Sequence, residues 1–247
     1  MSLLSTDQDR TKHKRWDIIN FIVKLFDNPS YLEIGTSLGE NYYNLNINNK
    51  ECCDPYNGTN PHPPYTYNMP SDDAFEIIKN KNKKYDIIFI DGLHCGKQVY
   101  RDIKNSVCCL NKNGFIVLHD CNPPTHFHAR LPHEKYPAYF SSPWNGNSYQ
   151  GLVKYKFENP DVYVRVVDTD WGVGIIQPDI KEINDNNISL MDECVETEKD
   201  IVVDGVININ NKYINWDFFS ENRKEILNLI DVNEFISYII SKKKSLN

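Results

Sequence analysis

Short runs of buried-type residues alternate with amphipathic segments along the first half of the chain. The runs show little of the alternation that marks a half-exposed strand, and each stops at Gly, Asp or His; they are Tyr31–Ile34, Lys50–Cys53, Tyr85–Ile90 and Phe115–Leu118. Such runs are typical of strands buried on both faces of a parallel sheet. Between them, helical spacing or capping residues predict helices over Lys14–Phe26, from Gly39 onward, from Ser71 to about Lys79, and over Gln98–Leu110 with a stop at Asn113-Gly114.

The last two predicted strands of the core are joined differently from the others. Val162–Val167 and Val173–Ile176 are separated by so few residues that a parallel crossover cannot join them, so we expect an antiparallel hairpin. With the alternation of strands and helices, this predicts an α/β fold: a doubly wound, Rossmann-like, mostly parallel sheet closed by an antiparallel C-terminal hairpin. The Pro- and Tyr-rich loop Pro61–Tyr67 has room for one further short strand.

We expect one core domain, residues 1–180, with a lid or substrate loop at about 121–150. A mainly helical C-terminal extension, residues 181–247, follows it. Within the extension, Val202–Ile207 has the pattern of a small hairpin, and Phe218–Ile240 has that of two amphipathic helices.

Composition and charge exclude several classes of function. The 247 residues carry 27 Lys and Arg against 34 Asp and Glu, a net charge of −7, so the chain lacks the basic field expected of a nucleic-acid-binding protein. No apolar run is long enough to span a bilayer, and Met1–Trp16 lacks the apolar core of a signal peptide. The seven cysteines form no C-x-x-C pair and are expected to be free thiols. We therefore expect a soluble, cytoplasmic protein that acts on a small molecule, with a homodimer as a further assembly to test.

The first candidate site is the glycine loop Glu33-Ile34-Gly35-Thr36-Ser37-Leu38-Gly39, after the first predicted strand. Its G-x-x-x-G spacing is neither the dinucleotide fingerprint nor a Walker loop, so a ligand loop and a plain strand-to-helix turn both stay open. The acid Glu33 favours a ligand, because a buried carboxylate needs a donor such as an amino group. Asp54, at the end of the second strand, is placed to accept hydrogen bonds from ribose hydroxyls, with a simple Asp-Pro turn as the alternative.

Two Asp/His pairs follow the next two predicted strands. Asp91 and His94 come after the third strand, and His119 and Asp120 come directly after the fourth. Because the carboxyl ends of parallel strands meet at one edge of a sheet, we expect these four side chains to converge. Asp91 and Asp120 can hold a hard divalent cation, and His94 or His119 can take a proton from a hydroxyl, since imidazole titrates near neutral pH. The alternative for each histidine is a bond to a neighbouring loop.

In combination these motifs resemble class I S-adenosylmethionine-dependent methyltransferases, most of all the branch associated with glycan and surface-polysaccharide biosynthesis. The motifs that carry the resemblance are Glu33-Ile34-Gly35-x-x-x-Gly39, Asp54-Pro55, Phe89-Ile90-Asp91-Gly92-Leu93-His94, Gly114-x-x-x-Leu118-His119-Asp120 and Trp171-Gly172-Val173-Gly174. The resemblance implies S-adenosyl-L-methionine as cofactor, with its amino group near Glu33, its ribose at Asp54 and its adenine near Met69–Asp72. The cofactor residues it implies are Glu33, Gly35, Thr36, Ser37, Gly39, Asp54, Ser71, Asp72 and Asp91.

The sequence also resembles the metal-dependent O-methyltransferases of the catechol and caffeoyl type. Those enzymes place a metal-binding Asp after the fourth strand and a lysine base three positions on, where this chain has Asp91 and His94. They place Asp-Asn after the fifth strand, where this chain has Asp120-Cys121, and cysteine is a poor ligand for magnesium. The resemblance therefore implies Mg²⁺ or another divalent cation at Asp91 and Asp120, and whether Asn122 reaches it as a third ligand stays open.

The acceptor side is a long loop between the fourth strand and a helix near Tyr149. The loop mixes rings and hydrogen-bond donors, a combination that suits a sugar; its candidate residues are His126, His128, Arg130, His133, Tyr136 and Trp144. We expect O-methylation of a sugar or another small hydroxylated acceptor. The catalytic residues expected are His94 as the base, Asp91 and His119, with Asp91 and Asp120 orienting the acceptor directly or through a metal. Two alternatives stay open: an oxidative or hydroxylase-type enzyme on the same fold, and a cofactor-binding module without catalysis.

Overall fold

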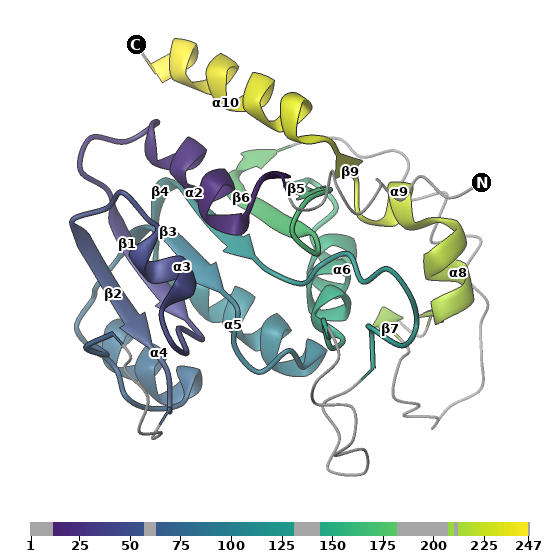
Figure 1. Cartoon of the computed structure of the whole chain (residues 1–247), viewed down its shortest axis with the longest axis horizontal. Coiled ribbons are helices and arrows are strands. Elements are labelled where there is room, and N and C mark those ends of the chain that lie inside the picture. The colour runs from purple at the N-terminus through teal and green to yellow at the C-terminus, as the bar shows by residue number, and fades with distance from the viewer. Residues whose placement is uncertain (1–11, 57–62, 131–143, 182–206, 210–211, 247) are drawn as a thin grey trace.

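The computed structural model describes residues 12–56, 63–130, 144–181, 207–209 and 212–246 (Figure 1). Its main feature is a seven-stranded sheet of order β2-β1-β3-β4-β6-β5-β9. The strands are β1 (Ser30–Ile34), β2 (Asn49–Cys53), β3 (Tyr85–Ile90), β4 (Leu110–Leu118), β5 (Val162–Val167), β6 (Val173–Lys181) and β9 (Leu229–Ile230). β1 is parallel to β2 and β3, and β3 is parallel to β4, whereas β6 runs antiparallel to both β4 and β5. The predicted sheet with its closing hairpin is confirmed, and β6 lies between β4 and β5.

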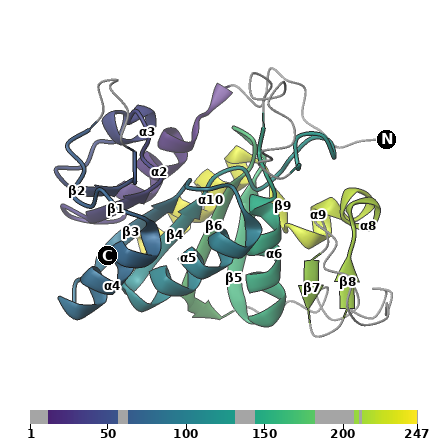
Figure 2. The ribbon, with the colours of Figure 1, turned by 90° about the horizontal axis from the view of Figure 1, so that it is seen from below.

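Helices cover both faces of the sheet (Figure 2). They are α2 (Arg15–Val23), α3 (Glu40–Tyr43), α4 (Ser71–Asn80), α5 (Gly96–Cys108), α6 (Ser148–Glu158), α8 (Trp216–Glu221), α9 (Arg223–Ile226) and α10 (Val232–Leu246). One apolar core joins α4, α5, α6, α8 and α9 to the sheet, and a second core joins α2 and α10 to it. Along β3, Ile88 and Ile90 belong to the first core, and Ile87 and Phe89 belong to the second. Burial on both faces explains why this run has no polar alternation.

Two connections differ from the prediction. α5 ends at Cys108, and β4 already begins at Leu110, so the dipeptide Asn113-Gly114 lies inside a strand and does not stop a helix. Asn113 has a φ of 61°, and a Cβ at Gly114 would lie 2.9 Å from the carbonyl oxygen of Asp86, so this dipeptide lets β4 bend close against β3. Among the described residues of the Pro- and Tyr-rich loop, the further strand is reduced to one parallel bridge between Cys53 and Tyr67.

The C-terminal segment is more varied than two helices. It forms α8, α9, the short strand β9 and then α10, and β9 pairs in parallel with β5. The predicted helical extension is confirmed in α8, α9 and α10, but the two helices predicted over Phe218–Ile240 are interrupted, because Leu229 and Ile230 extend to complete the sheet edge. The predicted hairpin Val202–Ile207 lies outside the described residues except for Ile207, which begins a small hairpin of β7 (Ile207–Ile209) and β8 (Lys212–Ile214). Nowhere in the described ranges does a helix have the length and apolar character needed to cross a membrane.

Candidate active site

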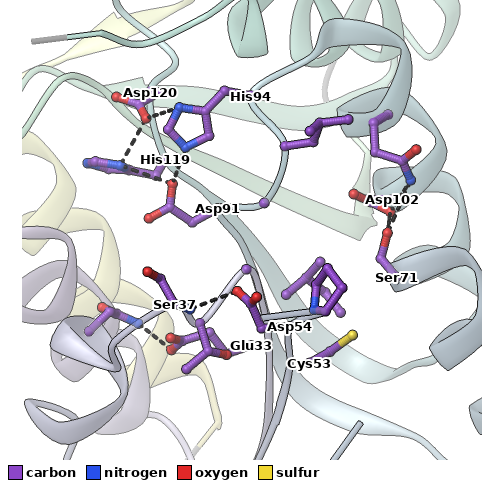
Figure 3. A pocket seen from close by; sticks show the side chains of 18 of the residues that line it. Glu33, Ser37, Cys53, Asp54, Ser71, Asp91, His94, Asp102, His119 and Asp120 are labelled. Atoms are coloured by element: carbon purple, nitrogen blue, oxygen red, sulfur yellow. Dashed lines mark hydrogen bonds and ion pairs between the residues drawn. The ribbon is translucent and has the colours of Figure 1, made fainter. Parts of the chain in front are cut away.

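A cavity of about 910 Å³ opens at the carboxyl ends of β1, β2, β3 and β4 (Figure 3). The topology places it there, because the loops after these parallel strands meet at one edge of the sheet. All residues predicted for the cofactor, the metal and catalysis line it except one: Glu33, Gly35, Thr36, Ser37, Asp54, Ser71, Asp72, Asp91, His94, His119 and Asp120. The exception is Gly39, which precedes α3 with a φ of 85° and whose missing Cβ leaves room for the Pro63 ring. Gly39 therefore serves the turn, outside the cavity wall.

The glycine loop is held against its neighbours by backbone contacts. Gly35 has a φ of 84°, and a Cβ at this position would lie 2.2 Å from the carbonyl oxygen of Asp91. Glycine is thus required here by the close approach of two loops of the protein itself. The backbone N–H of Ser37 donates to Asp54 Oδ2 at 2.8 Å, and that of Tyr56 donates to Asp54 Oδ1 at 2.8 Å. Asp54 therefore forms the Asp-Pro turn and also lines the cavity.

Glu33 forms a buried part of the cavity wall and is already hydrogen-bonded. The residue is 1% exposed, and its Oε2 accepts from the Tyr31 hydroxyl at 2.5 Å and from Asn41 Nδ2 at 2.7 Å. Burial raises the pKa of Glu33 to about 7, and these two neutral partners oppose that rise only in part. A cationic donor would stabilise the ionised form, so Glu33 suits a ligand that carries an amino group.

A second buried acid, Asp102 of α5, lines the same cavity although no sequence motif singles it out. Its Oδ1 accepts from Ser71 Oγ at 2.8 Å and from Gln98 Nε2 at 3.0 Å. Burial raises the pKa of Asp102 to about 6, against the effect of these two hydrogen bonds. The signal in the sequence is its position beside Ile103 on the apolar face of a helix. Burial of a carboxylate there costs free energy unless a hydrogen-bond donor or a cation compensates it.

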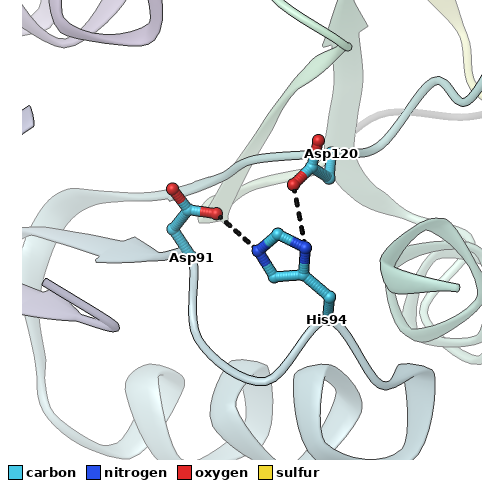
Figure 4. Close-up of side chains that lie close together, drawn as sticks. All are labelled: Asp91, His94 and Asp120. Carbon is cyan, nitrogen blue, oxygen red and sulfur yellow. Dashed lines mark hydrogen bonds and ion pairs between the residues drawn. The ribbon is translucent and has the colours of Figure 1, made fainter. Parts of the chain in front are cut away.

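At the other end of the cavity the two Asp/His pairs converge, as predicted (Figure 4). His94 lies between the two acids, with Nε2 at 3.1 Å from Asp91 Oδ1 and Nδ1 at 3.2 Å from Asp120 Oδ2. His119 Nδ1 lies 3.3 Å from each of the same two carboxylate oxygens. His94 and Asp120 both have left-handed backbone conformations, with φ of 54° and 59°, as is common where a loop aims side chains into a site.

A third acid, Asp170 in the turn between β5 and β6, completes this Asp/His cluster. It is 3% exposed, and its Oδ2 lies 3.4 Å from His119 Nε2. The same oxygen accepts from the backbone N–H of Arg15 at 2.9 Å and lies 3.1 Å from its guanidinium, while Oδ1 lies 3.2 Å from Lys14 Nζ. Arg15 Nε also lies 3.7 Å from Asp91 Oδ2. The start of α2 thus supplies cations to the cluster, a contact that no local pattern in the sequence indicates.

This pairing sets the charge of each group. Burial alone would raise the pKa of Asp91 and of Asp170, but the charge of His119 and its hydrogen bonds outweigh burial and hold both pKa values below the usual range. Burial alone would lower the pKa of His94 and His119, but the flanking carboxylates raise both. The acids and histidines of the cluster therefore shift one another's pKa values toward the charged forms.

The cluster also has the spacing of a cation site. Asp91, His94 and Asp120 each offer a ligand atom, and these atoms lie within 4.8 Å of one another. Two carboxylates and an imidazole suit Mn²⁺, Fe²⁺ or Zn²⁺, whereas Mg²⁺ favours oxygen ligands alone. Asn122, considered above as a third metal ligand, is engaged by two other residues. Its Nδ2 donates to Asp168 Oδ1 at 2.9 Å, and its Oδ1 accepts from Arg223 at 2.7 Å.

Two tryptophans flank the Asp/His cluster, and both line the cavity. The Trp144 ring stacks on His94 with ring centroids 4.9 Å apart and an interplanar angle of 24°, and Trp171 lies 5.6 Å from the ring of His128. Within the predicted lid the structure describes residues 121–130 and 144–150; His133 and Tyr136 lie outside the described residues.

Residues 32–121 match a protein family described as a methyltransferase domain. This segment carries the glycine loop, Asp54 and both predicted Asp/His pairs. No curated protein sequence matches the chain. The matched segment therefore includes most of the residues that line the cavity.

Solved structures with a similar arrangement include three methyltransferases. The O-methyltransferase of Bacillus cereus in complex with SAH is 13% identical over 65% of this chain and 79% of that chain, with a TM-score of 0.43. The SAH-bound methyltransferase of Podospora anserina is 17% identical over 72% of this chain and 83% of that chain, with a TM-score of 0.44. The O-methyltransferase of tomaymycin synthesis from Streptomyces achromogenes, in complex with SAM, is 11% identical over 67% of this chain and 79% of that chain, with a TM-score of 0.43.

Proposed function

We propose that the chain is an S-adenosylmethionine-dependent methyltransferase that methylates a hydroxyl of a small acceptor, such as a sugar. One observation carries this proposal: a single cavity contains both the glycine loop and the Asp/His cluster. A cofactor bound along the loop would present its reacting end beside groups that can align a hydroxyl and take its proton. The match of residues 32–121 to a methyltransferase domain supports the same class of enzyme.

The chemistry of the cavity wall suits this cofactor. Acids face the cavity at separate points on β1 and after β2, and they can accept hydrogen bonds from an ammonium group and from ribose hydroxyls. We assign the ammonium group to Glu33, the ribose to Asp54 and the adenine to the neighbourhood of Ser71 and Asp72, all of which line the cavity. When bound, the cofactor supplies an electrophilic methyl group on its sulfur.

His94 is the proposed base. The cofactor held along the glycine loop would supply the methyl group, and His94 would accept the proton that the acceptor hydroxyl loses. Asp91 hydrogen-bonds His94 Nε2, and Asp120 Oδ2 lies 3.2 Å from Nδ1; the two acids would orient the acceptor hydroxyl beside the ring, with His119 in contact with both acids. A base has to be neutral, and the two acids raise the pKa of His94 above its ordinary value of 6.5, so we expect transfer to accelerate as the pH rises past that value.

In a second version of the same proposal, a divalent cation takes part in the reaction. Asp91, His94 and Asp120 would hold it, and when bound it would polarise the acceptor hydroxyl as a Lewis acid. A ring nitrogen of His94 that binds a cation cannot also accept a proton, so His119 would then be the proton acceptor. Dependence on a metal decides between the two forms.

The tryptophans support a sugar-like acceptor. An aromatic ring can stack on the apolar face of a sugar while nearby polar groups bind its hydroxyls. Trp144 and Trp171 line the cavity beside the acids and histidines of the cluster, so both kinds of contact are available at one place.

Isothermal titration calorimetry with S-adenosylmethionine, S-adenosylhomocysteine and NAD tests the cofactor. We expect both sulfur compounds to bind and NAD not to bind. Binding of NAD alone would overturn the proposal and favour the oxidative alternative.

Transfer of a labelled methyl group to a panel of monosaccharides and catechols, with and without EDTA, then tests the reaction. Loss of transfer with EDTA and recovery with Mn²⁺ would assign the cation. Binding of the cofactor without transfer to any hydroxyl would favour the non-catalytic module.

A further inference from the structure

Four consecutive residues, Trp144–Asn147, precede α6 and lie outside the segment that matches a methyltransferase domain. Three of them contact His94. The Trp144 ring stacks on the His94 ring, a Cβ at Gly146 would lie 2.2 Å from the carbonyl oxygen of His94, and that carbonyl accepts from the backbone N–H of Asn147 at 3.1 Å. The segment therefore packs directly against the proposed base.

Asn145, the fourth member of the segment, contacts Asp120 instead. It is fully buried, and its Nδ2 donates to Asp120 Oδ1 at 2.8 Å and lies 3.5 Å from the carbonyl oxygen of Trp171. Its backbone N–H donates to the carbonyl of His128 at 3.0 Å, and its carbonyl oxygen accepts from Ser148 Oγ at 3.2 Å. These bonds give the Asn145 amide a fixed place, with its donor directed at one carboxylate oxygen of Asp120.

The two oxygens of Asp120 have separate partners. Oδ1 accepts from Asn145, whereas Oδ2 lies 3.2 Å from His94 Nδ1, as Figure 4 shows, and 3.3 Å from His119 Nδ1. A carboxylate can only accept hydrogen bonds, so the contact with Oδ1 requires the nitrogen of the amide and not its oxygen. The bond to Asn145 thus decides which oxygen of Asp120 faces the histidines.

The backbone around Asp120 leaves this carboxylate little other freedom. The backbone N–H groups of His119 and Cys121, on either side of Asp120, donate to carbonyl oxygens at the end of β3 and in the turn between β5 and β6, at 3.1 and 3.0 Å. Rotation of the carboxylate about its own side-chain bonds is what these contacts do not restrain. The hydrogen bond from Asn145 restrains it.

We propose that Asn145 is a positioning residue for methyl transfer: it holds Asp120 Oδ1, directs Oδ2 toward the His94 ring and so fixes the base beside the acceptor hydroxyl. This inference rests on the proposed function, since it takes the Asp/His cluster as the place of transfer. In the version with a divalent cation, the same hydrogen bond orients Asp120 as a ligand. A small misplacement of the reacting groups is enough to slow a transfer that depends on alignment.

Steady-state methyl transfer tests the proposal, with the monosaccharide or catechol that is methylated fastest in the panel described above. Asn145→Ala should lower kcat on the order of 10- to 100-fold and leave the affinity for S-adenosylhomocysteine, measured by calorimetry, within about twofold. Asn145→Ser, whose hydroxyl ends one atom short of the amide nitrogen, should show the same loss and serves if Asn145→Ala does not fold. Asn159→Ala is the matched control, because Asn159 Nδ2 also donates at 2.8 Å, to the carbonyl of Tyr155 at the other end of α6.

A double-mutant cycle with Asp120→Ala separates positioning from a general effect on packing. Asp120→Ala alone should lower kcat. In that background Asn145→Ala should lower kcat by less than about twofold more, because Asn145 acts through the carboxylate that is no longer there. Losses in kcat that multiply in the double variant would overturn the proposal.

Nitrogen-15 NMR of the histidine rings gives a second readout that needs no acceptor. The signals of His94 are those that disappear in His94→Ala. They should move in Asn145→Ala and stay in place in Asn159→Ala, because the first substitution frees the carboxylate beside His94 Nδ1 and the second lies far from it along α6.

The outcomes distinguish this inference from the proposed function. An unchanged kcat in Asn145→Ala and Asn145→Ser, or unchanged ring signals of His94, would overturn the positioning role while the wild-type protein still transfers methyl groups. Absence of transfer by the wild-type protein to every compound of the panel would instead refute the proposed function, and the positioning role with it.

Discussion

The buried acids in two parts of the cavity have different partners and opposite pKa shifts. At the Asp/His cluster, Asp91 and Asp170 are paired with histidines and with Arg15, and their pKa values lie below the usual range because the positive charges outweigh burial. Along the wall that runs from the glycine loop to α5, the part of the cavity that the proposed function gives to the cofactor and that we call the cofactor end, Glu33 and Asp102 have neutral hydrogen-bond partners, and burial raises their pKa values to about 7 and about 6.

The difference separates two tasks. The cluster carries its own counter-charges, so it can hold a fixed arrangement of acids and bases before any ligand arrives. The cofactor end lacks counter-charges, so its acids gain most when a ligand brings hydrogen-bond donors. This predicts that substitutions in the cluster change turnover and folding stability, whereas substitutions at the cofactor end change ligand affinity and the pH dependence of stability.

The largest expected effect is that of His94→Ala on turnover. Removal of the base should lower the rate of methyl transfer by roughly 10²- to 10⁴-fold, while the affinity for S-adenosylhomocysteine changes by less than about twofold. A methyl-transfer assay and calorimetry measure the two quantities. Lys112→Ala, at an exposed position of β4 outside the cavity, is the control. A large loss of cofactor affinity in His94→Ala would contradict the division of turnover and ligand affinity between the two parts of the cavity.

Asp170→Asn should destabilise the folded protein by about 2 to 4 kcal/mol, because it removes one of the buried carboxylates that offset the positive charges of His119 and Arg15. Urea unfolding at pH 7 measures this change. Asp73→Asn, at an exposed position, should stay within about 0.5 kcal/mol of the wild type. A loss below about 1 kcal/mol in Asp170→Asn would mean that the cluster does not depend on paired charges.

Glu33→Gln should change how stability depends on pH. The folded-state pKa of about 7 lies above the ordinary value of 4.5, so the folded protein binds an extra proton between these values. The wild-type protein should therefore lose up to about 3 kcal/mol of stability through this group as the pH rises from 4.5 to 7, and the variant should lack that loss. Thermal or urea unfolding across this pH range tests the difference. Parallel curves for the two proteins would contradict it.

The smallest expected effect is that of Ser71→Ala on ligand affinity. The substitution removes the hydroxyl that holds Asp102 Oδ1, so we expect about a fivefold weaker affinity for S-adenosylhomocysteine, with no change in stability beyond about 1 kcal/mol. Calorimetry measures the affinity. An unchanged affinity would show that Asp102 keeps its place without Ser71.

Residues at strand ends could be predicted from the sequence because their position depends on local pattern alone. Asp91 and Asp120 follow runs whose length and apolarity mark a buried strand, and parallel strands bring their carboxyl ends together. Local pattern alone gave the wrong place for Asn113-Gly114, which was expected to end a helix. These turn-forming residues instead lie inside β4 and bend it. The only signal for Asp102 is its place on the apolar face of a helix, and that signal does not show whether the acid meets a cavity or a neighbouring side chain.

The sequence by itself therefore determines the order of the strands and helices along the chain. It also determines which residues lie at the carboxyl end of each strand. Tertiary structure alone decided which partner each of those residues meets. Asp170 bonds Arg15, 155 positions away, and Arg223 holds Asn122, 101 positions away, so that Asn122 is not left free for the cluster. The reason is physical: strand formation follows from neighbours in sequence, but the charge and pKa of a buried group follow from the burial and the counter-charges that only the folded chain assembles.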